Sequence, residues 1–112
     1  MQNNYSYKLT PLALQDIDET LAYITEKLLN GKAAINLLDE LEHTLNSICS
    51  YPHAFPDCAV FMITDTMIRH APVNNYLLIY EIDEEEKQVN ILRFLYAKAD
   101  IANMPTGKRR GE

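Results

Sequence analysis

The sequence predicts an α+β fold in the order strand, helix, helix, strand, strand, strand (β-α-α-β-β-β). We expect an antiparallel helical hairpin packed on one face of a small, mainly antiparallel sheet. Two observations carry this prediction. Apolar residues recur at intervals of three and four in two consecutive stretches, which is typical of amphipathic helices. Two apolar runs near the end of the chain flank a short acidic turn, which is typical of a β-hairpin.

The size and composition fit one globular domain. The chain has 112 residues, of which 47% are hydrophobic and 23% charged. We expect a single domain over residues 1–105 and a basic, disordered tail over residues 106–112, which lack an apolar anchor. No apolar run reaches the roughly 18 residues of a membrane span, and the first residues do not resemble a signal peptide. We therefore expect a cytoplasmic protein without a membrane partner.

The first two predicted elements are a strand over residues 5–9 and a helix that begins beside it. Thr10 suits the N-cap position, and Pro11 suits the first helical turn, where its missing N–H is not needed. One apolar stripe then follows the helical period: Leu14, Ile17, Leu21, Ile24 and Leu28. We expect this helix to end at Asn30-Gly31, with Gly31 in the left-handed conformation.

A second helix follows within about two residues, so the pair must fold back as a hairpin. Its stripe is Ala34, Leu37, Leu38, Leu41, Leu45 and Ile48. The helix ends at Tyr51-Pro52, residues 52–58 form a loop, and residues 59–63 are a short apolar run whose type is open.

Three strands complete the prediction. Residues 67–73 can form a strand, but Pro72 cannot donate to an inner ladder, so we expect an edge strand or a bulge there. Residues 76–82 and 89–96 pair through the acidic turn at 83–87. These two strands carry apolar side chains at odd and even positions, so both faces should be at least partly covered.

Charge and cysteines exclude some functions. The net charge is −6, distributed as −4 over residues 1–50 and −2 over residues 51–112, which disfavours a general nucleic-acid binder. Four residues could in principle hold zinc, but their spacing lacks the close cysteine pair of a structural site. They are His43, Cys49, His53 and Cys58. We therefore expect no metal and no cofactor.

Four stretches resemble the RelE/ParE superfamily of type II toxin–antitoxin toxins, also labelled plasmid stabilisation proteins. They are YKLTPLALQDIDETLAYI, AAINLLDELEHTLNSICSYP, RHAPVNNYLLIYEID and VNILRFLYAKAD. The resemblance implies a toxin neutralised by a cognate antitoxin, with DNA contacted only through that antitoxin. Toxins similar to RelE cut mRNA in the ribosome, whereas toxins similar to ParE poison DNA gyrase without chemistry of their own.

The endonuclease alternative requires a base, an acid and cations around the scissile phosphate. The candidate catalytic residues are Arg69, Arg93 and Tyr96, with His70 and Lys98 as further candidates. Leu95 stands where several ribosome-dependent relatives carry a catalytic His. Each candidate also has a structural alternative: Arg93 could pair with Glu81 or Asp100, and Tyr80 and Tyr96 could be core aromatics.

The leading hypothesis is a ParE-like, gyrase-type poison, because the catalytic set is incomplete. The alternatives are a RelE-like, ribosome-dependent mRNA endonuclease and a non-toxic binding or oligomerisation domain on the same scaffold. We expect the antitoxin to cover the exposed sheet edge and the sheet face opposite the helices.

Overall fold

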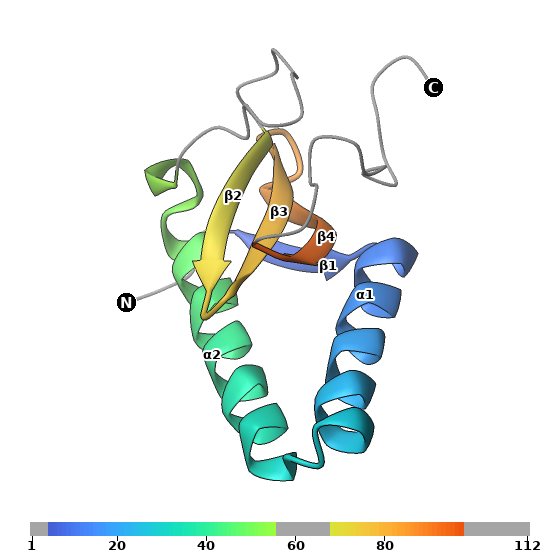
Figure 1. Ribbon diagram of the computed structural model, residues 1–112. Coiled ribbons are helices and arrows are strands. Elements are labelled where there is room, and N and C mark those ends of the chain that lie inside the picture. The colour runs from blue at the N-terminus through green and yellow to red at the C-terminus, as the bar shows by residue number, and fades with distance from the viewer. Residues whose placement is uncertain (1–4, 56–67, 98–112) are drawn as a thin grey trace.

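The computed structural model describes residues 5–55 and 68–97 and has the predicted order of elements (Figure 1). Two short helical pieces are added: a π-helical turn, η1, after the first helix, and a 3₁₀ turn, η2, after the second. The elements are β1 (Ser6–Leu9), α1 (Pro11–Ala22), η1 (Tyr23–Lys27), α2 (Gly31–Ser50), η2 (Pro52–Ala54), β2 (Ile68–Val73), β3 (Tyr76–Asp83) and β4 (Gln88–Tyr96). The α+β class is confirmed, while the run at 59–63 and the tail at 106–112 lie outside the described residues.

The four strands form one mixed sheet in the order β1-β4-β3-β2. β1 runs parallel to β4, and the other two pairs are antiparallel. β2 lies at one edge with Pro72 exposed, so the prediction of an edge strand there is confirmed. The register of β3 and β4 shifts between Ile79 and Tyr80, which pair with Arg93 and Ile91 and leave one extra residue on β4.

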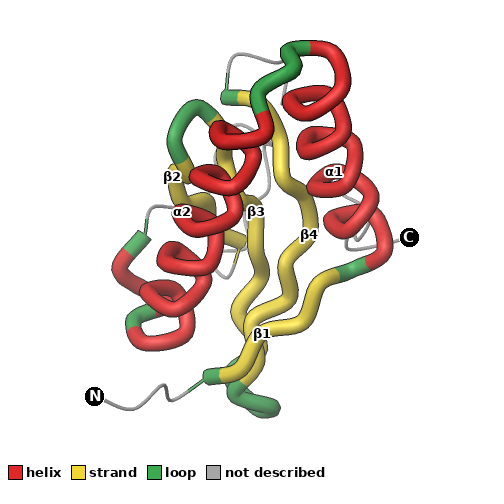
Figure 2. Tube along the Cα trace, turned by 90° about the horizontal axis from the view of Figure 1, so that it is seen from below, coloured by secondary structure: helices red, strands yellow, loops and turns green. Residues whose placement is uncertain are grey.

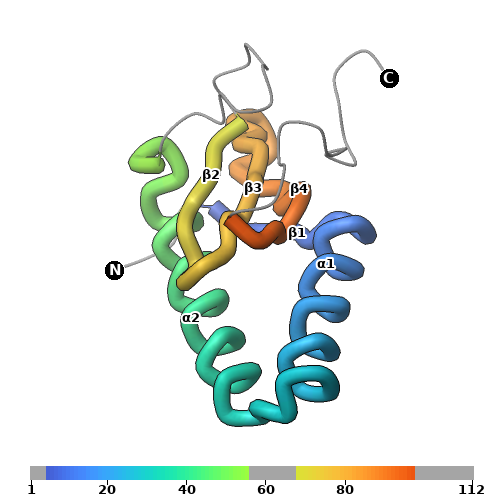
Figure 3. The backbone as a smooth tube through the Cα atoms, in the orientation of Figure 1, coloured from blue at the N-terminus to red at the C-terminus, as the bar shows by residue number. Residues whose placement is uncertain are grey.

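The two helices pack on one side of the sheet and form the main core with it. Seen from below, α2 crosses β2 and β3 while α1 runs alongside β4 (Figure 2). The helices diverge from their connection as a V, and the apex of this V lies well away from the sheet (Figures 1 and 3). The core is apolar; its largest fully buried members from the sheet are Tyr80, Phe94, Leu78, Ile91, Val73 and Val89.

The N-terminus of α1 is fixed as predicted, and the middle of the predicted apolar stripe faces the core: Ile17 and Ile24 are buried and Leu21 packs against them. The Thr10 hydroxyl accepts a hydrogen bond from the Ala13 N–H (3.2 Å) and donates one to the Ile91 carbonyl (2.8 Å). Ala13 and Ile17 are buried, whereas Leu14 of the predicted stripe is 45% exposed. The prediction was wrong only at the two ends of the stripe, since Leu28 is also exposed (55%), while Ala13 takes part in the core in the first turn.

The connection between the helices differs from the prediction. Leu29, not Gly31, adopts the left-handed conformation, with φ of 52°. Gly31 is the first residue of α2, and Asn30 caps that helix by accepting a hydrogen bond from the Ala33 N–H (3.0 Å). The helical segment ends in a π-helical turn at Lys27, before the expected Asn30-Gly31, so the reversal of the chain falls on Leu29. The Asn30 N–H donates to the Ile24 carbonyl (3.1 Å) across this reversal.

The centre of the sheet face opposite the helices is buried rather than exposed to solvent. Ile68, Ile79 and Leu92 are at most 5% exposed and form a second apolar cluster with the half-buried Leu77. The expectation that a partner covers this whole face is therefore wrong for its centre. The physical reason was visible in the sequence, because strands with apolar residues at odd and even positions must bury both faces.

The left-handed leucine gives the first prediction. Replacing Leu29 by glycine should raise the free energy of unfolding by about 0.5–1 kcal/mol, because glycine adopts positive φ without strain. Little packing is lost, since the Leu29 side chain is 83% exposed. Urea unfolding measures the change.

Leu28→Gly is the matched control. Leu28 is 55% exposed but has right-handed backbone angles (φ −92°), so glycine there relieves no strain and should not stabilise the protein. A Leu29→Gly protein no more stable than wild type would contradict the assignment of strain.

Candidate functional site

Arg69 lies near the start of β2 and holds the segment after α2. Its Nη1 donates hydrogen bonds to the carbonyl oxygens of Phe55 (2.8 Å) and His53 (3.3 Å). It pairs across the sheet with Tyr80, whose hydroxyl donates to the Pro52 carbonyl (2.6 Å). Burial raises the pKa of Tyr80, although nearby Arg69 opposes the shift. Tyr80 is therefore a core aromatic, and its hydroxyl and Arg69 both fasten η2 to the sheet.

Arg93 is buried in an ion pair with Asp16 of α1. Its Nε lies 2.6 Å from Asp16 Oδ2 and its Nη2 lies 3.0 Å from Oδ1, so the contact is bidentate. The same carboxylate accepts the backbone N–H of Phe94 at 3.0 Å. The sequence offered Glu81 and Asp100 as partners. The structure shows Asp16 instead, while Asp100 lies outside the described residues.

Tyr96 ends β4 and is 46% exposed. Its ring makes an edge contact with Tyr76 at 5.6 Å, and Tyr76 stacks on Phe94 at 5.0 Å. The pKa of Tyr76 is raised, mainly by burial and then by the neighbouring Tyr96. Phe94, Tyr76 and Tyr96 thus form a row of aromatic side chains, and Tyr96, at the end of the row, is exposed to solvent.

The remaining candidates lie elsewhere. His70 pairs across β2 and β3 with Ile79, which places it on the face away from the helices. Its Nδ1 is buried without a hydrogen-bond partner. Arg69, as the neighbouring strand residue, must face the opposite way. Lys98 lies outside the described residues.

The described candidates do not converge on one point. Arg69 and Tyr96 are separated by four residues along the strands and by two strands across, on the order of 15 Å. Arg93 is engaged with Asp16, and His70 is on the other face from Arg69. Cleavage of RNA needs acid, base and cation within hydrogen-bond reach of one phosphate. The described part of the chain holds no such arrangement of these residues.

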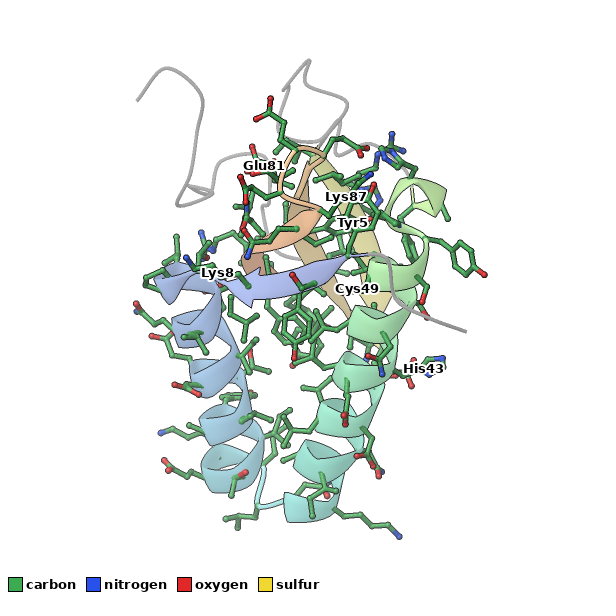
Figure 4. The ribbon with its side chains drawn as sticks, turned by 180° about the vertical axis from the view of Figure 1, so that it is seen from behind. Tyr5, Lys8, His43, Cys49, Glu81 and Lys87 are labelled. Atoms are coloured by element: carbon green, nitrogen blue, oxygen red, sulfur yellow. The ribbon has the colours of Figure 1, made fainter. Side chains whose placement is uncertain are left out.

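The four residues weighed as zinc ligands are also dispersed as far as the structure describes them. Figure 4 shows His43 projecting outward from α2, whereas Cys49 lies where α2 meets β1. Cys49 is buried, and burial raises its pKa, which disfavours the thiolate that binds metal. Cys58 lies outside the described residues, and within them no group of three possible ligands gathers.

A polar cluster that the sequence did not indicate joins three distant segments. Glu84, in the turn between β3 and β4, accepts a hydrogen bond from the Tyr5 hydroxyl (2.7 Å) and pairs with His53. Lys87 lies 3.6 Å from the same carboxylate and 5.2 Å from the centre of the Tyr5 ring (Figure 4). Tyr5 and Glu84 are 79 residues apart, so no local pattern could have linked them.

The structure defines a class by its fold: a small α+β domain in which a helical hairpin packs on a mixed four-stranded sheet, and whose described candidate residues do not gather at one point. The sequence matches the family described as "ParE toxin of type II toxin-antitoxin system, parDE" over residues 7–101. The chain belongs to this family.

Two solved structures share the fold. The chromosomal ParDE toxin–antitoxin system of P. aeruginosa matches with a TM-score of 0.66 at 13% identity, covering 87% of this chain and 100% of that chain. The toxin–antitoxin complex RelBE2 of Mycobacterium tuberculosis matches with a TM-score of 0.55 at 18% identity, covering 88% and 98%. A search of curated proteins found no significant match.

The Asp16–Arg93 pair gives the second prediction. Arg93→Ala and Asp16→Ala should each lower the free energy of unfolding by about 3–5 kcal/mol, because each leaves a buried charge without its partner. The double variant should lose less than the sum of the two, since only one interaction is removed. Urea unfolding of all four proteins measures the coupling.

Asp18→Ala is the control for this cycle. Asp18 is exposed on the same helix, so its removal should change stability by no more than about 0.5 kcal/mol. If Arg93→Ala unfolds like the wild type, the ion pair does not hold α1 in place.

The Glu84 cluster gives the third prediction. The pKa of Glu84 is lowered, first by the hydrogen bond from Tyr5 and then by that from His53. Its stabilising contribution is therefore complete above the ordinary pKa of glutamate and is lost as pH falls through the lower pKa of the folded state. Tyr5→Phe should move the Glu84 pKa back toward its ordinary value in an NMR titration.

Tyr7→Phe is the matched control, because Tyr7 is an exposed tyrosine of β1, two residues from Tyr5, with no contact to Glu84. An unchanged Glu84 pKa in Tyr5→Phe would show that the Tyr5 hydroxyl does not stabilise the carboxylate.

Proposed function

We propose that this ParE-family toxin inhibits growth by binding a cellular protein, as a gyrase-type poison, and is neutralised by a cognate antitoxin. Membership of the family supports the toxin role, and both structural matches are toxin–antitoxin systems, which supports an antitoxin partner. Such a toxin acts where its target is, so we expect it in the cytoplasm. Within the described residues, no helix has the length and apolar character needed to cross a bilayer.

The observation that favours binding over chemistry is the engagement of Arg93. Its guanidinium contacts both oxygens of the Asp16 carboxylate and is only 8% exposed, so it is poorly placed to neutralise a substrate phosphate. The net charge of −6 also opposes approach to ribosomal RNA. A protein that acts by binding another protein needs neither a free arginine for a phosphate nor a basic surface for RNA.

The RelE-like endonuclease remains the second candidate, because the ring of Tyr96 is 46% exposed at the end of β4. In that case Tyr96 would act with Arg69, Arg93, His70 or Lys98 after rearrangement on the ribosome. The third candidate, a non-toxic binding domain, would use the same scaffold without a growth effect.

We place the antitoxin at the edge of the sheet rather than over the centre of the face away from the helices. Ile79 and Leu92 at that centre are already buried. β2 is an edge strand, and an added strand can use its outer backbone groups up to Pro72, which has no N–H to donate.

The fourth prediction concerns growth. Induced expression should inhibit growth and produce gyrase–DNA cleavage complexes, and co-expression of a short neighbouring reading frame that encodes an acidic, helical protein should restore growth. Primer extension on cellular mRNA should show no codon-phased breaks. Tyr96→Phe should still inhibit growth, because it removes only a hydroxyl and keeps the ring contact with Tyr76.

Two outcomes would contradict the proposal. Codon-phased breaks that disappear in Tyr96→Phe would establish the endonuclease. Normal growth with folded protein, checked by circular dichroism of the purified chain, would leave the non-toxic binding domain.

A further inference from the structure

The direction of the backbone groups along β2 follows from one hydrogen bond at the end of the sheet. The Ala97 N–H donates to the Asn75 carbonyl (2.8 Å), so the backbone groups of Asn75 point toward the strand β4. Backbone groups alternate in direction along a strand, so those of the next residue, Tyr76, point toward β2. Tyr76 pairs there with Val73, which therefore directs its own backbone groups inward, to β3.

The outer side of β2 therefore presents the backbone groups of every second residue. Counting back from Val73, the residues that face outward are Ile68, His70 and Pro72. Pro72 fits this assignment, because proline is tolerated where its missing N–H would face away from the sheet. No strand that the structure describes pairs with this side of β2 (Figure 1). The unpaired groups are the N–H and carbonyl of Ile68 and His70 and the carbonyl of Pro72.

The side chain of His70 is a second, independent observation at the same edge. It lies on the sheet face away from the helices, and its Nδ1 is buried without a hydrogen-bond partner. Buried N–H groups without an acceptor are rarer in proteins than buried acceptors without a donor, so we assign the ring proton to Nε2. The ring is half-buried, and the described residues give Nε2 no acceptor. The Nε2–H of His70 is therefore a donor that a partner can use.

A second copy of this chain fits the edge poorly. Two β2 strands paired antiparallel about His70 would set Pro72 of each copy opposite Ile68 of the other. Each proline would then leave one Ile68 carbonyl without a donor. The two chains would also meet with a net charge of −6 each. A strand from a different protein meets only one proline and does not bring the same negative charge.

The surroundings of His70 indicate which side chain such a strand carries. In a strand paired with β2, the residue opposite His70 lies on the same face, with the two Cβ atoms about 4.5–5.5 Å apart. An oxygen on that residue can accept the Nε2–H. Glu81 pairs with Ile68 and lies on this face too, so a carboxylate opposite His70 would meet a like charge. Threonine or asparagine supplies the oxygen without the charge, and threonine is also favoured in strands.

We propose that the outer edge of β2 binds an extended strand of a partner protein that carries threonine or asparagine opposite His70. The backbone groups of Ile68 and His70 hold the strand, and the pairing ends at Pro72, which has no N–H. The Nε2–H of His70 selects the side chain. The inference rests on the antitoxin binding proposed at this edge, and it adds the register of the strand and the residue that the edge prefers.

The fifth prediction tests this edge with the full-length chain and two short strand peptides. The peptides differ only in having threonine or valine, which are similar in shape, opposite His70. N-methyl groups on their outer side prevent them from pairing with each other. In an NMR titration, the amides of Ile68 and His70 should shift more than those of Arg69 and Ala71. The threonine peptide should bind about fivefold more tightly than the valine peptide, because only threonine accepts the Nε2–H.

Two variants and one control separate side-chain selection from backbone pairing. His70→Phe keeps an aromatic ring without a donor, so both peptides should bind it equally. His70→Pro removes an outward N–H and none of the bonds to β3, so binding of both peptides should be lost while the circular dichroism spectrum stays unchanged. His43→Phe is the matched control, because His43 is exposed on α2, and it should keep the fivefold preference.

Several results would overturn the proposal. Equal binding of the two peptides by the wild type, no binding of either, or a preference that survives in His70→Phe would each contradict selection by His70. Shifts at Tyr7 and Leu9 instead would assign the peptide to β1, the other edge strand. A dimer in sedimentation that His70→Pro dissociates would assign the edge to a second copy.

The peptide titration and the growth assay fail separately. If the neighbouring reading frame restores growth but neither peptide binds, the antitoxin stands and only the strand chemistry is wrong. If the threonine peptide binds selectively but induction leaves growth normal, the edge chemistry stands and the toxin role is wrong.

Discussion

The carboxylate of Asp16 closes the open edge of β4, and the arrangement of helix on sheet depends on it. β1 is short and pairs only as far as Leu9 with Ile91, so the second half of β4 has no strand neighbour on that side. There Asp16 accepts the Phe94 N–H and both donors of Arg93. Asp16 of α1 thereby takes the place of a longer β1 strand, because its carboxylate accepts the hydrogen bond from the Phe94 N–H, which the edge of the sheet would leave unpaired.

The ion pair between Asp16 and Arg93 also limits the chemistry in which Arg93 can take part. Among the described residues, Arg93 is the cation nearest the end of β4, and its bidentate pair with Asp16 binds it to α1. Releasing it for a substrate would leave Asp16 buried and unpaired, at a cost of several kcal/mol. This supports the proposal that the protein acts by binding another protein. The exposed features that remain are the ring of Tyr96, the edge of β2 and the hairpin apex.

The sequence predicted the features that depend on neighbours along the chain and missed those that join distant segments. Thr10-Pro11, the helical periods and the acidic turn act within a few residues, so the element order, the cap of α1 and the edge position of β2 were readable. Asp16 pairs with Arg93 across 77 residues, and no pattern distinguishes it from the other acids of α1. Leu29, not Gly31, has the left-handed conformation, because the first helical segment ends in a π-helical turn at Lys27. Apolar spacing alone does not reveal such a turn.

Residues that stabilise the fold and residues that are exposed at the surface also lie in different parts of the molecule. The core and the closed edge lie where the helices meet the sheet, whereas the apex lies beyond it, so substitutions at the apex leave the packed layers intact (Figure 3). The ParDE system of P. aeruginosa keeps the fold at a TM-score of 0.66 with only 13% identity. Such divergence is possible because a fold is specified by pattern and volume, while partner choice depends on particular exposed side chains. The exposed leucines where α1 and α2 connect lie outside the packed core, so they can vary without altering the fold.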